Sequence, residues 1–285
     1  MKPARFAHHA PRTLEEALAL LATHGEEARV LAGGQSLVPT MAFRMARPAV
    51  LVDINRIAPL DHVTVAGGSL RIGALARHAR FETQVVEGAL GTLLARIAHH
   101  IAHPPLRLRG TFCGSLAHAD PASEWCAAAL ALEARMVLAR ADGLREVAAE
   151  DWFQGVFSTA LAPGEMLREV VLPLPAPSWR GGFAEFARRA GDFALAMAVV
   201  GLRLEGGLVG GARIALGGIG GQPVLAREAM ALLEGQAPSS ALLDEAAATA
   251  ARHCDPQEDM HAPAEYRREL VAVMVKRALR QAVSA

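Results

Sequence analysis

The spacing of apolar residues near the start of the chain predicts an amphipathic helix. Four apolar residues between positions 14 and 21 recur at intervals of three and four, which places them on one helix face. Thr13 and Glu16 have the types and separation of a capping box, in which two otherwise unpaired N–H groups are satisfied at a helix start. We therefore expect a helix over residues 13–24.

Short apolar runs after this helix predict strands, and longer periodic segments predict helices. We expect strands at 29–31, 50–53 and 70–74 and a hairpin around Asp142-Gly143 within 135–147. We expect a mostly helical segment at 81–103 and a further helix that begins at Asp120-Pro121.

The last part of the chain has a different pattern. Three prolines fall within residues 172–177, and we place a domain boundary there, between 1–175 and 176–285. Beyond it, apolar runs at 183–188, 194–204 and 208–216 predict a three-stranded antiparallel sheet, and periodic segments at 224–234, 240–253 and 263–283 predict helices on one face of it. The fold class that follows is α+β.

Composition narrows the range of functions. The 285 residues include 29 basic and 29 acidic side chains, and only 5% are aromatic, which argues against a nucleic-acid partner. The longest apolar run, 193–202, is about half of the ~20 residues that a membrane span needs. The first residues have no apolar signal segment, and three scattered cysteines indicate neither a disulfide framework nor a zinc or iron–sulfur site. We therefore expect a cytoplasmic protein with small molecules or proteins as partners.

Two glycine-containing turns are the candidate binding elements. The first, 31–36, follows a predicted strand, and the second is 110–115. Glycine permits backbone conformations in which successive N–H groups point into one concavity, and such concavities bind phosphate. Two of them would suit the two phosphates of a dinucleotide, although either is also explained by a tight turn alone. Neither the Rossmann fingerprint nor a P-loop motif is present.

Three segments in order give the chain a resemblance to a known family. They are AGGQSLVPTMAFRMARPAVLVDINRI (32–57), RGTFCGSLAHADPASEW (109–125) and FAEFARRAGDFA (183–194). Together they resemble the FAD-binding medium subunits of molybdenum hydroxylases, the family of carbon monoxide dehydrogenase and xanthine dehydrogenase. The resemblance implies a two-lobed PCMH-type FAD-binding domain, followed by a C-terminal domain like that of carbon monoxide dehydrogenase flavoproteins.

The resemblance also implies which residues hold FAD, with no metal ligand and no catalytic acid or base. The implied residues are Ala32, Gly33, Gly34, Gln35, Ser36 and Leu37 in the first loop, Thr111, Phe112, Cys113, Gly114 and Ser115 in the second, and Ala117, His118, Asp120, Glu124, Leu167 and Phe193 around them.

Four positions in the candidate site and near it depart from the family pattern. Phe112-Cys113 stands in place of Ile-Gly, and a cysteine there is expected to narrow the backbone angles of the second loop. Glu185 occupies a position where some relatives have lysine, which changes the local charge. Phe193 replaces a frequent tyrosine or tryptophan at the flavin ring, so it offers a ring without a hydroxyl.

The function implied is that of an oxidoreductase subunit. A molybdenum large subunit carrying molybdopterin would oxidise the substrate, a small subunit with [2Fe–2S] centres would relay electrons, and FAD on this chain would pass them to NAD, a quinone or oxygen. Two alternatives remain open: a stand-alone FAD-dependent oxidoreductase of the same flavin fold, and a non-catalytic nucleotide-binding assembly subunit.

Overall fold

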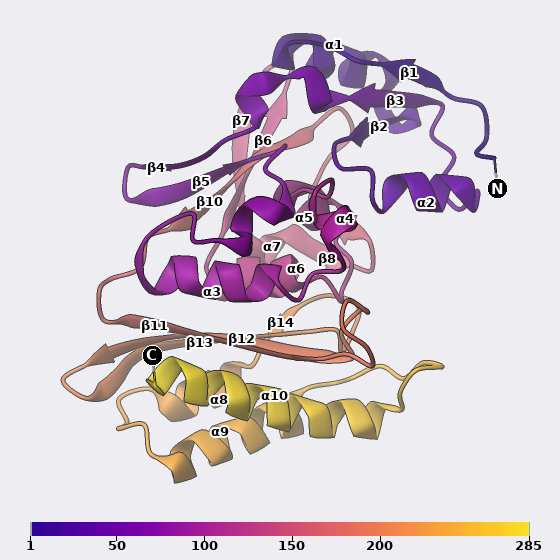
Figure 1. The fold of residues 1–285 in the computed structure, drawn as a ribbon. Helices are drawn as coiled ribbons and strands as arrows, with labels where there is room; N and C mark the ends of the chain where they lie inside the picture. The colour runs from indigo at the N-terminus through magenta and orange to yellow at the C-terminus, as the bar shows by residue number, and fades with distance from the viewer. Residues whose placement is uncertain (1, 285) are drawn as a thin grey trace.

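The computed structural model describes residues 2–284, which form two lobes followed by a layer of sheet and helices (Figure 1). The first lobe is a parallel sheet in the order β1-β3-β2. Its elements are β1 (Ala7–His9), α1 (Leu14–His24), η1 (Gly25–Glu27), β2 (Ala28–Leu31), α2 (Leu37–Ala42), β3 (Val50–Asp53), η2 (Ile54–Arg56) and η3 (Ala58–Leu60).

The helix expected at 13–24 is confirmed as α1. The Thr13 hydroxyl accepts the Glu16 N–H at 3.1 Å, and the Glu16 carboxylate accepts the N–H of Arg12 at 2.8 Å rather than that of Thr13. The apolar face of α1 is buried against β2 and β3. The strands expected at 29–31 and 50–53 are likewise confirmed as β2 and β3.

The second lobe is built on a five-stranded antiparallel sheet in the order β4-β5-β10-β6-β7. Its strands are β4 (Val63–Ala66), β5 (Ser69–Gly73), β6 (Arg135–Arg140), β7 (Gly143–Ala148) and β10 (Met166–Pro173). The hairpin predicted around Asp142-Gly143 is confirmed, because β6 and β7 close with Arg140 paired to Gly143.

The remaining elements of this lobe lie around that sheet. They are η4 (His78–Glu82), α3 (Gly88–Ala98), α4 (Pro104–Arg107), α5 (Phe112–His118), α6 (Glu124–Ala131), α7 (Ala149–Trp152), β8 (Phe153–Gly155) and β9 (Ser158–Thr159). The helix expected over 81–103 was too long. Only 88–98 forms α3, because Gly88 adopts a left-handed conformation (φ +84°) at its start and Pro104 begins a separate turn at α4.

The C-terminal layer is an antiparallel sheet in the order β11-β12-β13-β14. Its elements are β11 (Trp179–Phe186), β12 (Ala196–Glu205), β13 (Leu208–Gly217), β14 (Val224–Leu225), α8 (Arg227–Leu233), α9 (Ser240–His253) and α10 (Ala264–Ser284). The three-stranded prediction missed β14, whose two residues are too short for a periodic signal. The three helices are confirmed and cover one face of the sheet (Figure 1).

Each face of the C-terminal sheet packs into a different hydrophobic core. Phe183, Met197 and Val199 belong to a large cluster that also fills both lobes. Ala184, Ala198 and Val200 belong to a second cluster formed with α8, α9 and α10. Alternate strand residues point to opposite faces, so the sheet separates the second lobe from the C-terminal helices. Within residues 2–284, no helix has the length and apolarity that crossing a membrane requires.

Candidate functional site

The two predicted loops meet at Gly33. A Cβ atom at position 33 would lie 2.5 Å from the carbonyl oxygen of Arg109 and 2.7 Å from the Cα of Gly110. Both neighbours are backbone atoms and neither can move aside independently, so only glycine permits this approach. The first loop, at the end of β2, therefore lies directly against the start of the second loop, although the two belong to different lobes.

The first loop presents a run of unpaired backbone donors. Within residues 2–284, no backbone carbonyl or side chain accepts a hydrogen bond from the N–H groups of residues 33–37. Gly34 adopts a left-handed conformation (φ +72°), which turns the backbone at the centre of this run. The side chain of Gln35 folds back, and its Nε2 donates to the carbonyl of Gly33 at 3.0 Å. Successive free N–H groups of this kind form a concavity suited to an anion.

The second loop is the start of a short helix rather than an open turn. Thr111 is the N-cap of α5: its hydroxyl accepts the N–H of Gly114 at 3.0 Å. The N–H of Phe112 donates to the carbonyl of Ala76 at 2.9 Å, which fastens the loop to the segment after β5. The sequence Gly-Thr-Phe-Cys-Gly did not predict this helix, because its two glycines are typical of a turn.

The side chains of Phe112 and Cys113 point into the core. Phe112 packs on Phe81 and Trp125, with ring centroids 5.4 and 4.6 Å apart. The Cys113 thiol donates to the carbonyl of Ile72 at 3.4 Å, and burial raises the pKa of this thiol. Cys113 has helical rather than left-handed backbone angles, so position 113 does not require glycine. The expectation that cysteine would restrict the backbone of the second loop is therefore wrong.

The helix expected to open at Asp120-Pro121 begins later. The Asp120 carboxylate accepts the N–H of Ala122 at 2.9 Å, and the Asp120 carbonyl accepts the N–H of Ser123, which makes a turn. Ser123 is the N-cap and Glu124 the first residue of α6. A short aspartate side chain satisfies a turn N–H as readily as a helix N–H, which explains the wrong assignment.

Asn55 and Arg77 connect the two loops, and the residue patterns had identified neither. The Asn55 Nδ2 donates to the carbonyl of Ala32 at 2.8 Å. Arg77 donates from Nη2 to the Asn55 Oδ1 at 2.6 Å and from Nη1 to the carbonyl of Arg109. Asn55 lies within the first quoted segment, whereas Arg77 carries no local signal because its partners lie 22 and 32 residues away.

Asp53 holds Asn55 in place for this contact. Its Oδ1 accepts from the backbone N–H of Asn55 at 2.9 Å and from its Nδ2 at 2.6 Å, and its Oδ2 lies 3.2 Å from the Nε2 of His8. Burial acts to raise the pKa of Asp53, but the bonds from Asn55 and His8 outweigh it and lower that pKa. Asp53 is therefore an ionised anchor for the amide.

His78 supports the second loop from beneath. The Trp125 Nε1 donates to His78 Nδ1 at 3.0 Å, and a Cβ atom at position 110 would lie 2.6 Å from the His78 ring. Burial, followed by the charges of Arg77 and Arg107, lowers the pKa of His78 to about 4. The imidazole is therefore neutral at pH 7 and accepts the indole proton.

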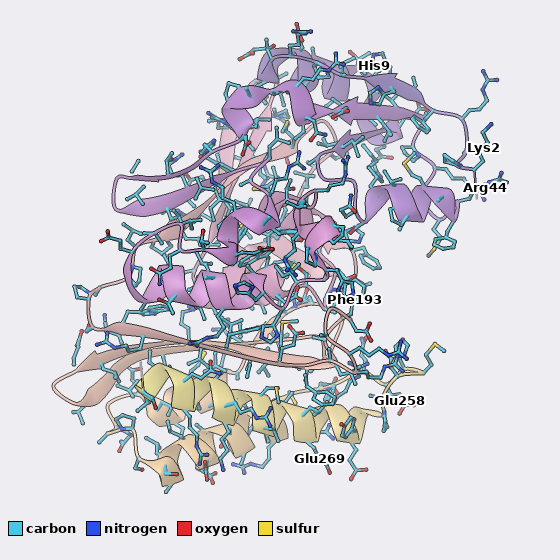
Figure 2. The ribbon with its side chains drawn as sticks, viewed as in Figure 1. Lys2, His9, Arg44, Phe193, Glu258 and Glu269 are labelled. Carbon is cyan, nitrogen blue, oxygen red and sulfur yellow. The ribbon has the colours of Figure 1, made fainter. Side chains whose placement is uncertain are left out.

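Phe193 and His118 are the two predicted ring-bearing residues outside the loops. Phe193 is 70% exposed, on the loop between β11 and β12, at the edge of the molecule between the second lobe and the C-terminal sheet (Figure 2). A Cβ atom on Gly191 would lie 2.4 Å from the His103 ring, so this loop packs beside the start of α4. The ring of His118, at the end of α5, lies 4.8 Å from that of Phe157, and burial lowers the pKa of His118.

The other predicted residues differ in how deeply they are buried. Ser115 and Ala117 are half-buried on α5, Ser36 and Leu37 begin α2, and Glu124 is buried at the start of α6. Leu167 is buried in β10, paired with Leu138 within the core of the second lobe. The structure therefore brings the two loops together, and it places Leu167 in the hydrophobic core of the second lobe.

Comparisons with known proteins give two family matches. Residues 4–175 match the family described as the FAD binding domain in molybdopterin dehydrogenase, and residues 182–282 match the CO dehydrogenase flavoprotein C-terminal domain. The chain is 38% identical to the 6-hydroxypseudooxynicotine dehydrogenase complex subunit alpha of Paenarthrobacter nicotinovorans, covering 99% of this chain and 96% of that one.

Carbon monoxide dehydrogenases are similar to this chain in both sequence and structure. The medium chain from Afipia carboxidovorans is 36% identical over 99% of this chain and 98% of its own length. A solved carbon monoxide dehydrogenase from Hydrogenophaga pseudoflava, which lacks the Mo-pyranopterin moiety of its cofactor, superposes with a TM-score of 0.95 at 38% identity, covering 100% of this chain and 99% of that chain. The resemblance drawn from the three segments is thereby confirmed: the chain belongs to the family of FAD-binding medium subunits of molybdenum-containing oxidoreductases.

Proposed function

We propose that this chain binds FAD with its diphosphate held between the first loop and the N-terminal turn of α5. The observation that carries this proposal is the apposition at Gly33, where unpaired N–H groups of residues 33–37 lie against the start of the second loop. Backbone N–H groups favour negative charge, and a second loop alongside them suits a ligand with two linked phosphates.

The residues proposed to contact FAD are those that the sequence indicated, except Leu167, and two further residues are proposed to position the loops. The first loop contributes Ala32 to Leu37, and the second contributes Thr111 to Ser115 mainly through its backbone, because three of its side chains are buried. Ala117, His118, Asp120, Glu124 and Phe193 border the loops, and Leu167 would act only as packing behind them. Asn55 and Arg77 are proposed as positioning residues that fix the distance between the loops.

The proposed role is electron transfer within a complex. Electrons would pass from a molybdopterin-containing large subunit to [2Fe–2S] centres on a small subunit. FAD on this chain would accept them from those centres and release them to NAD, a quinone or oxygen. The protein would bind and orient the cofactor and shield part of it from water. The names of the relatives, which describe a medium chain and a subunit of a complex, support a hetero-oligomer. We further propose a cytoplasmic location and a functional division into 1–175 and 176–285.

Exposed apolar side chains support a partner beside the loops. Phe43 is 65% and Met45 81% exposed just after α2, and Leu108 is 66% exposed just before the second loop. Each of these segments lies next to one of the two loops in the chain, and exposed large apolar side chains are found at protein interfaces. We therefore propose that the electron-donating partner docks on this side of the molecule.

Purification with and without the partner subunits tests this function. The chain alone, reconstituted with FAD, is expected to show flavin absorbance that substrate does not bleach. The chain combined with both partner subunits is expected to have its flavin reduced by substrate in the absence of oxygen. Reduction of the flavin by substrate on the isolated chain would favour a stand-alone oxidoreductase, and a chain that never retains flavin would favour an assembly subunit.

A further inference from the structure

Two glutamates from different domains are buried close together where the second lobe meets the C-terminal sheet. The Glu185 side chain on β11 is only 4% exposed, and its Oε2 has no hydrogen-bond partner within residues 2–284. Glu124, the first residue of α6, is 8% exposed. A buried polar atom without a partner is rare in folded proteins and requires an explanation.

Strand geometry shows which way Glu185 points. Phe183, two residues earlier, and Met197, its partner on β12, both belong to the cluster shared with the second lobe. The intervening Ala184 belongs to the cluster under α10, and a Cβ atom on Gly182 would strike the carbonyl of Ala278 in that helix. Because side chains alternate along a strand, Glu185 faces the second lobe and not α10.

Helix α6 brings Glu124 to the same place. A Cβ atom on Gly217 would lie 3.0 Å from the Cγ of Met197 and 3.2 Å from the Cβ of Ala127, so α6 sits over the row of residues that Glu185 extends. Glu124 precedes Ala127 by three positions and so shares its helix face. Glu124 therefore lies on the side of α6 that faces this sheet, and its charge contributes to the raised pKa of Glu185 across the domain boundary.

No cation within residues 2–284 neutralises this pair. His100 Nδ1 lies 3.9 Å from the Glu185 Oε1, beyond hydrogen-bond distance, and burial, followed by His99 and Arg96, lowers the pKa of His100. Asp120, before α6, adds a further negative charge near Glu124. The strand beside β11 contributes the apolar Met197 at this position. Two buried like charges without a cation repel strongly at low dielectric constant.

We propose that Glu124 and Glu185 share a proton and so form a pH-sensitive contact between the second lobe and the C-terminal sheet. In the protonated form, one carboxyl group donates to the other carboxylate, which gives the unpartnered Glu185 oxygen its bond. Loss of the proton leaves two facing carboxylates and weakens the contact. Glu124 is also among the residues proposed to border FAD, and the shared proton requires only the side chains of Glu124 and Glu185.

The electrostatic surroundings agree with this assignment. Burial and the nearby Asp120 raise the pKa of Glu124 to about 7, and burial and the nearby Glu124 raise that of Glu185 to about 9. Because these groups interact, the values describe the pair, which holds one proton between about pH 7 and 9. Folding raises both pKa values above the ordinary 4.5, so the stability that the pair contributes is fully present below about pH 4.5. It is lost as the pH rises from there until both groups are ionised above about pH 9.

Infrared spectroscopy of the full chain, labelled with carbon-13 glutamate, tests the proposal directly. At pH 8 the wild type is expected to show the C=O stretch of a protonated glutamate, which disappears as the pH is raised. Glu185→Gln is expected to lose this band at pH 8. Glu124→Gln is expected to shift the titration of the remaining band to lower pH, because the like charge is replaced by an amide that donates to the carboxylate.

Chemical denaturation between pH 5 and 10 supplies a second readout. The free energy of unfolding of the wild type is expected to fall with rising pH more steeply than that of Glu185→Gln. The matched control is Glu258→Gln, at an exposed position (Figure 2), and it should keep the wild-type slope. Absence of the band from the wild type at pH 8, its persistence in Glu185→Gln, or an unchanged titration in Glu124→Gln would each overturn the proposal.

Discussion

At the scale of single residues, the candidate site depends on a fork of hydrogen bonds from Arg77. One guanidinium reaches both Asn55, which holds the first loop, and the carbonyl of Arg109, which begins the second. A planar guanidinium offers several donors in fixed directions, whereas an ammonium group is a compact point charge. The separation of the two loops is therefore set by a side chain that need not touch the ligand.

Arg77→Lys is accordingly expected to weaken FAD binding about tenfold, equivalent to about 1.4 kcal/mol. Quenching of flavin fluorescence on titration measures this change. The matched control is Arg80→Lys, because Arg80 makes only a 3.5 Å ion pair with Asp61 between side chains that are each about half exposed. Equal affinities for the two variants would show that Arg77 does not position the loops.

At the scale of elements, α5 depends on its N-cap. The Thr111 hydroxyl accepts the N–H of Gly114, and α5 has only seven residues to stabilise it otherwise. Thr111→Ala is expected to lower the free energy of unfolding by about 0.5–2 kcal/mol, whereas Thr111→Ser should retain most of it. Urea denaturation measures both changes, and an equal loss in the serine variant would indicate that the methyl group, rather than the cap, stabilises the site.

The elements that could be predicted from sequence are those with a strong local pattern. The helix N-cap at Thr13, the apolar strand before Gly33 and the Asp142-Gly143 hairpin are each determined by residues close in sequence. The start of α5 was missed because its glycines resemble a turn, and β14 because two residues carry no periodicity. Asn55, Arg77 and the Glu124–Glu185 pair depend on contacts between distant segments, which periodicity does not reveal.

At the scale of the whole molecule, the C-terminal sheet packs the two regions that match separate families against each other. One face of this sheet contributes Phe183, Met197 and Val199 to the core of the second lobe, all fully or almost fully buried. Removing residues 176–285 would expose the surfaces of α3 and α6 that pack against this sheet. A domain boundary in sequence is therefore not a boundary in packing.

Calorimetry of the full chain is accordingly expected to show a single unfolding transition. Met197→Ala should lower the stability of the entire chain by about 2–5 kcal/mol, since the side chain is fully buried between the domains. Fragment 1–175 should not unfold cooperatively. Two separate transitions, with only one of them shifted by Met197→Ala, would contradict this account.

The central claim is that FAD is held where Gly33 meets the second loop, and an FAD titration of Gly33→Ala tests it most directly. The added Cβ would lie 2.5 Å from the carbonyl oxygen of Arg109, so the loops must separate. The control is Gly220→Ala, whose Cβ would meet its nearest atom at an ordinary 3.9 Å. The account predicts that Gly33→Ala keeps its fold by circular dichroism but loses FAD at least tenfold more readily than Gly220→Ala. Equal retention of FAD by the two variants would contradict it.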